Sequence, residues 1–165
     1  MKKSNTLSLA RGGIIAALYV ALTYASFLFG LSSGAIQLRL SEMLTILPAF
    51  LPEAIPGLYI GCIIANLLTG GSIYDILLGS LATLIGAIGA RALRKSHPLL
   101  IAMPTVIANA LIVPLVIILS AGGAETFASF PYFALTVGIG EFLSAGLLGW
   151  LAYRAIEKNK ILPKL

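Results

Sequence analysis

Long apolar stretches alternate with short polar segments along the whole chain. Six apolar stretches can be distinguished: residues 12–29, 43–51, 54–68, 73–90, 98–119 and 132–153. A helix needs about 20 residues to cross the ~30 Å hydrocarbon core of a bilayer, so 165 residues with short connections accommodate about six spans. The pattern predicts an all-α fold: one domain, residues 1–165, forming an integral membrane bundle of six transmembrane helices.

The second and third stretches are the least regular of the six. Pro48, Pro52 and Pro56 recur there every four residues. Proline lacks a backbone donor and clashes with the preceding helical turn, so we expect a kinked or partial second helix. The glycine and serine residues of 30–34 and 69–72 mark the turns on either side of this region.

Composition supports a membrane protein and excludes a soluble one. Hydrophobic residues make up 59% of the chain and charged residues only 10%, whereas soluble domains are about a quarter charged. The net charge of +5 does not indicate a nucleic-acid partner, because the basic residues form short clusters between apolar stretches.

The basic residues also predict the orientation in the membrane. Lysine and arginine collect in cytoplasmic loops. In a six-helix arrangement, ten of the eleven basic residues fall on the side of the two termini, which we therefore predict to be cytoplasmic. Arg39 is the exception and lies on the outer side together with Glu42, Asp75 and Glu125. The expected location is the cell membrane, crossed several times.

The residues needed for common catalytic chemistry are missing from the sequence. His97 and Cys62 are the single histidine and the single cysteine, so neither a histidine pair nor a cysteine cluster is available to bind a metal. No G-x-x-x-x-G-K-[ST] loop occurs, so ATP-driven transport requires other subunits. We predict no metal, no cofactor and no enzymatic activity.

Two polar residues are predicted to lie deep in the bilayer. Glu141 falls about nine residues into the last stretch, roughly 13 Å from its outer end at 1.5 Å per residue. Asn109 lies about halfway along the fifth stretch, so the two side chains meet at similar depth if these helices pack together. A carboxylate at this depth costs roughly 2.5–3.5 kcal/mol on insertion scales and needs compensation.

Four further polar residues converge on the outer half of the bundle: Arg39, Glu42, Asn66 and Asp75. One interpretation is a structural network, with Arg39 and Glu42 as a local ion pair and the asparagines bonding between helices. The other is a solute site, because three carboxylates outnumber one arginine and leave acceptors for a ligand rich in donors. Glu53 and Glu125 are expected to lie at the inner surface and in a loop.

Small residues recur every four positions along the first helix, at Gly13, Ala17, Ala21 and Ala25. Such a stripe lets another helix approach closely. The partner is either another helix of this chain or a separate subunit.

Several motifs resemble the queuosine-precursor transporter family, QueT. They are IQLRLSE at 36–42, AIPGLYIGC at 54–62, Asp75 with GSLAT at 79–83, NALIV at 109–113, and G-x-G-E at 138–141. The resemblance covers most of the chain and implies the substrate-binding S component of an energy-coupling factor (ECF) transporter, which works with a transmembrane coupling subunit and two ATPase subunits.

The resemblance also implies roles for the residues named above. The small-residue stripe on the first helix would dock the coupling subunit. The solute would be a 7-deazaguanine base, with its adjacent N–H donors on Glu141, an aminomethyl substituent on Asp75 or Glu42, and Asn66 and Asn109 on the remaining heteroatoms. Two alternatives stay open, an S component for another vitamin and an intramembrane enzyme using Glu141 and Asp75 as acid and base.

Overall fold

The computed structural model describes residues 2–31, 36–122, 125–160 and 162, and this part of the chain is helical without strands. Its helices are α1 (Lys2–Leu28), the 3₁₀ helix η1 (Leu40–Ala49), α2 (Ala54–Leu68), the π turn η2 (Asp75–Gly79) leading into α3 (Ser80–Ala92), α4 (Pro98–Ser120), the short 3₁₀ helix η3 (Phe127–Ser129), α5 (Phe130–Glu141), the π segment η4 (Phe142–Leu148) and α6 (Gly149–Asn159). Since η3, α5, η4 and α6 are continuous, they act as one long helix. The predicted all-α fold with six helices is confirmed.

Four of the six helices are long and apolar enough to cross a membrane: 5–28 within α1, the 18 residues of η2 and α3, α4, and the 33 residues from η3 to α6. The other two are shorter. The 10 residues of η1 rise only about 20 Å as a 3₁₀ helix, and the 15 residues of α2 rise about 22 Å. These are the segments in which the prolines predicted irregular structure.

The 3₁₀ helix η1 lies inside the bundle, where it packs against α1, α3, η4 and α6. It contains Pro48, and its last carbonyl groups lack intrahelical partners. The guanidinium of Arg91 on α3 donates Nη1 to the carbonyl oxygens of Pro48 and Ala49, at 3.2 and 3.4 Å. This side chain therefore closes the inner end of η1, as basic residues do at helix C-termini.

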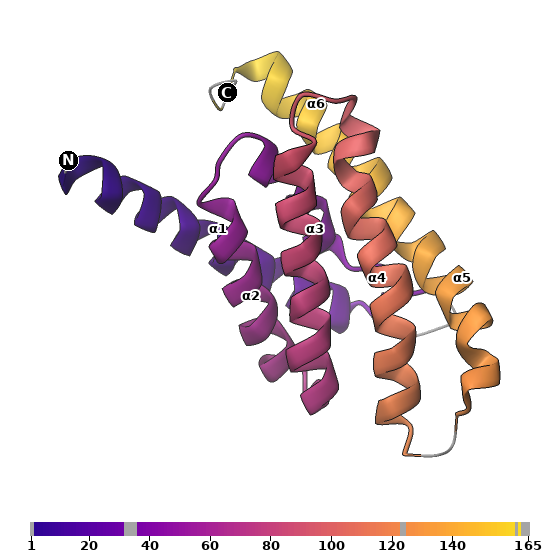
Figure 1. Cartoon of the computed structure of the whole chain (residues 1–165). Coiled ribbons are helices and arrows are strands. Elements are labelled where there is room, and N and C mark those ends of the chain that lie inside the picture. The colour runs from indigo at the N-terminus through magenta and orange to yellow at the C-terminus, as the bar shows by residue number, and fades with distance from the viewer. Residues whose placement is uncertain (1, 32–35, 123–124, 161, 163–165) are drawn as a thin grey trace.

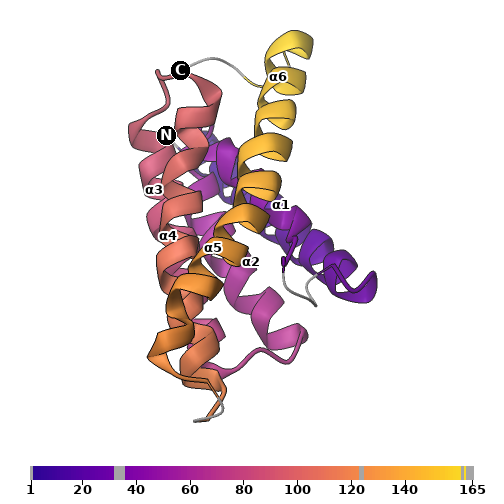
Figure 2. The ribbon, with the colours of Figure 1, turned by 90° about the vertical axis from the view of Figure 1, so that its right-hand side faces the viewer.

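The helix α1 crosses the bundle obliquely, whereas α2, α3, α4 and α5 run more nearly side by side (Figures 1 and 2). It crosses α2 through small residues. A Cβ atom on Gly57 would lie 2.6 Å from the Gly12 carbonyl oxygen, and one on Gly61 would lie 3.0 Å from that of Ala16. The contact within this chain thus uses Gly12 and Ala16, one position away from the predicted stripe.

The start of α1, the connection from α3 to α4 and the end of α6 lie toward the same end of the molecule (Figures 1 and 2). At this end the Arg11 guanidinium and the Glu53 carboxyl form an ion pair of 3.3 Å. His97 ends the connection by accepting a hydrogen bond from the Leu99 amide at its Nδ1 atom. The clustering of basic residues at this end is what the predicted cytoplasmic orientation requires, and that orientation stays a prediction.

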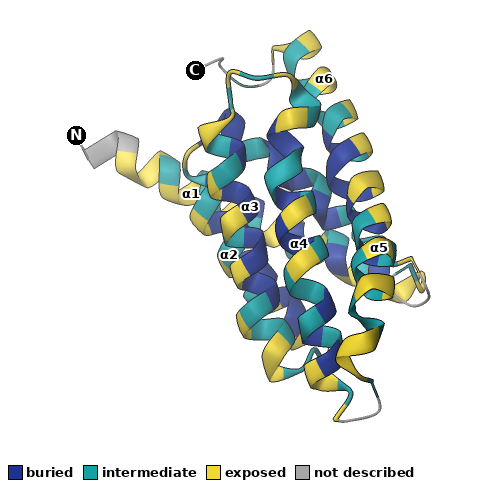
Figure 3. Ribbon diagram, turned by 45° about the vertical axis from the view of Figure 1, so that its right-hand side comes forward, coloured by how far each residue is buried: buried dark blue, intermediate teal, exposed yellow. Residues whose placement is uncertain are grey.

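Figure 3 shows buried residues on the inner faces of the helices and exposed residues on the outer faces. Many exposed positions carry large apolar side chains, among them Leu9, Leu111 and Leu135, which are 78, 54 and 64% exposed. A soluble monomer rarely exposes so continuous an apolar surface. The outer surface is suited to lipid, in agreement with a membrane protein of several spans.

Candidate functional site

The deepest polar residues lie where α4 packs against α5 and η4. Glu141, at the end of α5, is 7% exposed, and Asn109 on α4 is 4% exposed. The helices approach closely here, since a Cβ atom on Gly138 would lie only 3.5 Å from that of Ala110. The Asn109 side chain lies near the Glu141 carboxyl, and the common depth of the two residues in the bilayer stays a prediction.

Six buried side-chain atoms of the described residues have no hydrogen-bond partner, and three of them belong to Glu42, Asn109 and Glu141. They are Oε2 of Glu42, Oγ of Ser80, Oγ1 of Thr105, Nδ2 of Asn109, Oε2 of Glu141 and Oγ of Ser144. Buried polar groups in native proteins are nearly always paired, and each unpaired one costs about 1–3 kcal/mol. Glu42, Asn109 and Glu141 therefore offer acceptors and a donor that the described helices do not use.

Glu42 reaches the same region from η1. The sequence placed it before the second helix, but η1 begins at Leu40 and includes it. The Tyr19 hydroxyl on α1 donates a short hydrogen bond to Oε1 of Glu42, while Oε2 has no partner. The carboxyl of Glu42 is thus fixed on one side and open on the other.

Arg39 lies just before η1, within electrostatic range of both Glu42 and Glu141. Among the described residues it forms no ion pair with Glu42, so this part of the structural interpretation is not supported. The reason is geometric, because Glu42 turns toward Tyr19 on α1. The guanidinium keeps donors that the described side chains leave unused.

The segment that carries Arg39 is pressed against α5. A Cβ atom on Gly140 would lie 2.1 Å from the Gln37 carbonyl oxygen, a separation that no side chain can adopt without movement. The Leu38 amide also donates to the carbonyl of Leu31, at 2.8 Å. Glycine at 140 therefore lets this segment lie directly beside Glu141.

A small cavity of about 160 Å³ lies next to Arg39. It is lined by Thr23, Phe27, Arg39, Asn66, Thr69, Gly71 and Asp75. Three of the six predicted site residues line this cavity, and Arg39 borders both the cavity and the carboxyl pair Glu42 and Glu141. The predicted residues thus form two adjoining groups.

Asn66 and Asp75 are partly used within the protein. The Asn66 side chain donates Nδ2 to the Asp75 carbonyl oxygen, at 2.8 Å. One Asp75 carboxyl oxygen accepts from the amide and the hydroxyl of Ser72, at 2.9 and 2.7 Å. These hydrogen bonds connect the end of α2 to the start of η2. The interpretation as a structural network therefore fits Asn66 and Asp75. It does not fit Glu42, Asn109 and Glu141, which keep unpaired atoms.

Sequence reasoning missed Tyr19, Thr105 and Ser144. Tyr19 belongs to a polar series with Thr23 and Ser26, spaced four and three residues apart in an apolar helix, and that spacing could have indicated a buried polar face. Thr105 stands one turn from Asn109, and Ser144 stands three residues after Glu141. Isolated hydroxyls in apolar helices often bond their own backbone, so their sequence gave no distinct signal.

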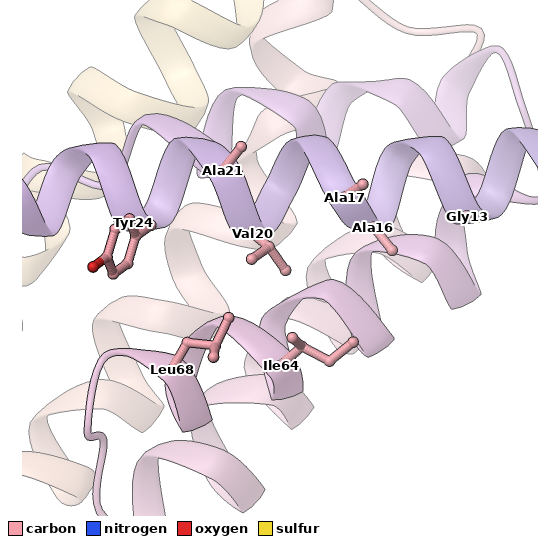
Figure 4. A pocket seen from close by; sticks show the side chains of 8 residues that line it. All are labelled: Gly13, Ala16, Ala17, Val20, Ala21, Tyr24, Ile64 and Leu68. Carbon is pink, nitrogen blue, oxygen red and sulfur yellow. The ribbon is translucent and has the colours of Figure 1, made fainter.

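The predicted docking stripe on α1 faces outward. Gly13, Ala17 and Ala21 are exposed and line an open cavity of about 680 Å³ on the α1 surface beside α2. In Figure 4, Val20 and Tyr24 of α1 point toward α2, whereas Ala17 and Ala21 point away from it. These three residues therefore do not form the close contact of α1 with α2, which uses Gly12 and Ala16.

Comparisons with known proteins support the same class of protein. A family model described as "QueT transporter" matches residues 9–158. A curated protein from Lactococcus lactis subsp. cremoris, named queuosine precursor transporter QueT, is 42% identical over 85 residues. That alignment covers 52% of this chain and 50% of the relative, so the chain spans about half the length of the curated relative it matches. No solved structure matches.

Proposed function

Because the chain belongs to the QueT transporter family, we propose that it is the substrate-binding subunit of an ECF transporter that imports a queuosine precursor across a prokaryotic cell membrane. The substrate is a 7-deazaguanine base. The curated relative is named for transport of a queuosine precursor, and the buried site has the polarity that such a base requires. The chain supplies recognition of the solute and does not transform it.

The proposal depends most on the unpaired atoms around Glu141. The guanine-like edge of the base presents adjacent N–H donors, and a carboxylate can accept both in a forked arrangement, as it does with arginine. Glu141 accepts these donors, with Oε2 of Glu42 as a second acceptor nearby. The Asn109 amide and the Arg39 guanidinium donate to the acceptor atoms of the base.

The adjoining cavity receives the substituent on the base. Its volume of about 160 Å³ suits a small group, and Asp75 and Asn66 line it. An aminomethyl substituent carries a positive charge, which the Asp75 carboxylate stabilises. Asn66 both supports the wall, through its bond to Asp75, and contacts the substituent.

The energy for transport comes from other subunits. The sequence has no ATP-binding loop of the P-loop type. The exposed stripe Gly13, Ala17, Ala21 and the neighbouring Ala25 dock the coupling subunit, which is itself bound to two ATPase subunits. Solute enters from the outer side, and ATP hydrolysis in the partners then drives its release to the cytoplasm.

Calorimetric titration of the purified protein in detergent or nanodiscs tests this function. We expect submicromolar affinity for a 7-deazaguanine and binding at least a hundredfold weaker for riboflavin and thiamine. Mass spectrometry of the recovered ligand should show no chemical change, which distinguishes a binding subunit from an intramembrane enzyme. Preferential binding of another vitamin, or a changed ligand, contradicts the proposal.

A further inference from the structure

The buried face of α1 makes a continuous series of hydrogen bonds to the segment that begins η1. Tyr19 donates to Oε1 of Glu42, and the Thr23 hydroxyl donates to Oγ of Ser41 at 2.7 Å. The Leu40 amide donates to Oγ of Ser26 at 2.9 Å. Three consecutive residues of η1 are therefore bonded to α1 through side chains.

These bonds are shielded from solvent and lipid. Tyr19, Ser26 and Ser41 are fully buried, and Thr23 is 3% exposed. The spacing of 19, 23 and 26 places the three α1 side chains on one helical face. Such bonds hold a segment in one position, because breaking any of them leaves a buried polar group unpaired.

Tyr19 acts directly on a group of the candidate site. The two oxygens of a carboxylate are chemically equivalent, so a free carboxyl can present either of them to a ligand. The Tyr19 hydroxyl occupies Oε1 of Glu42 and leaves Oε2 as the unpaired one. The hydrogen bond from Tyr19 therefore determines which Glu42 oxygen is left for a ligand and in which direction that oxygen points.

From this geometry we infer that α1 positions the substrate site, with Tyr19 as the positioning residue that orients the Glu42 carboxylate for the ligand. The inference rests on the proposed function, since the ligand is the 7-deazaguanine base. Tyr19 touches Glu42 and not the base. The opposite face of α1 carries the exposed stripe, so a movement of α1 is transmitted to Glu42 through Tyr19.

The substitution Tyr19→Phe tests this role, because it removes the hydroxyl and keeps the ring that fills the core. We expect affinity for 7-deazaguanine to fall about tenfold, the size of one hydrogen bond to a charged group. Tyr24→Phe is the matched control, since Tyr24 is 44% exposed on the same helix, and it should leave affinity unchanged.

A double-mutant cycle separates positioning from a general loss of stability. If Tyr19 acts through Glu42, adding Tyr19→Phe to Glu42→Gln should weaken binding by no more than about twofold further, because the two residues share one interaction. Fully additive losses overturn the inference. A loss with Glu42→Gln and none with Tyr19→Phe also overturns it, while leaving the proposed function intact.

Hydrogen exchange supplies a readout that needs no ligand. In the ligand-free protein, Tyr19→Phe should accelerate amide exchange across residues 40–46 at least fivefold, and Tyr24→Phe should not. Unchanged exchange overturns the inference. A wild-type protein that binds no 7-deazaguanine overturns the proposed function, and exchange then still decides whether Tyr19 holds Glu42 in place.

Discussion

Glu141 and Glu42 place two carboxyl groups in the interior of an apolar bundle, each with one oxygen unpaired. Burying a carboxyl group without a hydrogen-bond donor costs free energy, and van der Waals contacts with apolar neighbours do not offset that cost. Arg39 offsets part of this cost through its charge, and it does so without forming an ion pair with Glu42. At the scale of single residues, these unpaired oxygens are the reason for proposing a donor-rich ligand at this position.

Substitution Glu141→Gln should therefore weaken binding of 7-deazaguanine by about 1–3 kcal/mol, or roughly 5- to 150-fold in Kd. The amide keeps the size of the side chain but loses one acceptor and the charge. Titration calorimetry gives the change directly. Glu125→Gln is the control, because that carboxyl accepts a hydrogen bond from Ser129 of η3, and equal losses in both variants contradict a site at Glu141.

Polar residues are rare within apolar stretches, so the site residues that lie there could be identified from the sequence. Glu141 and Asn109 are isolated polar residues within such stretches, so their proximity was predictable. The bond from Tyr19 to Glu42 was not, because it joins α1 to η1 across a turn whose path the sequence does not specify. The pairing of Asp75 with Ser72 likewise depends on local turn geometry.

The elements themselves were largely predictable because each apolar stretch became a helix. Prolines at 48, 52 and 56 correctly indicated irregular structure, but the 3₁₀ form of η1 and its start at Leu40 did not follow from them. The π segments η2 and η4 were also unforeseen, since their hydrogen bonding depends on packing. The segment η2 begins at the predicted site residue Asp75 and directly precedes α3, and η4 directly follows the predicted site residue Glu141.

Close contact between α5 and the segment before η1 gives a test at the scale of elements. Gly140→Ala places a Cβ atom against the Gln37 carbonyl, and overpacking of this kind costs about 1–3 kcal/mol. We expect Arg39 to be displaced and ligand affinity to drop at least tenfold, measured by calorimetry. Gly138→Ala meets only ordinary contact with Ala110, so comparable losses in both variants argue against the contact as the cause.

In the whole molecule, one face of α1 is bonded to Glu42 of the candidate site and another face is exposed. A Cβ atom on Gly13 meets nothing within 4 Å, so Gly13→Leu should leave folding and ligand affinity unchanged. In cells that express the coupling and ATPase subunits, we expect this variant to lose most uptake of labelled substrate and to copurify poorly with them. Normal uptake would show that the stripe does not dock a partner.

Orientation is the second property of the whole molecule that can be tested. Cys62 is fully buried, so a cysteine introduced elsewhere can be labelled selectively. In intact cells, a membrane-impermeant maleimide should label Thr126→Cys and spare Lys95→Cys, and both should react after permeabilisation. The reverse pattern would place the termini outside.

A structure of the protein with a bound 7-deazaguanine tests the central claim most directly, because it shows what completes the unpaired atoms between η1, α4 and α5. We expect a base donor within about 3.2 Å of Glu141 Oε2, with Glu42 and Asn109 also in contact. A ligand bound elsewhere, such as the groove between α1 and α2, with these atoms satisfied by water alone, would contradict it.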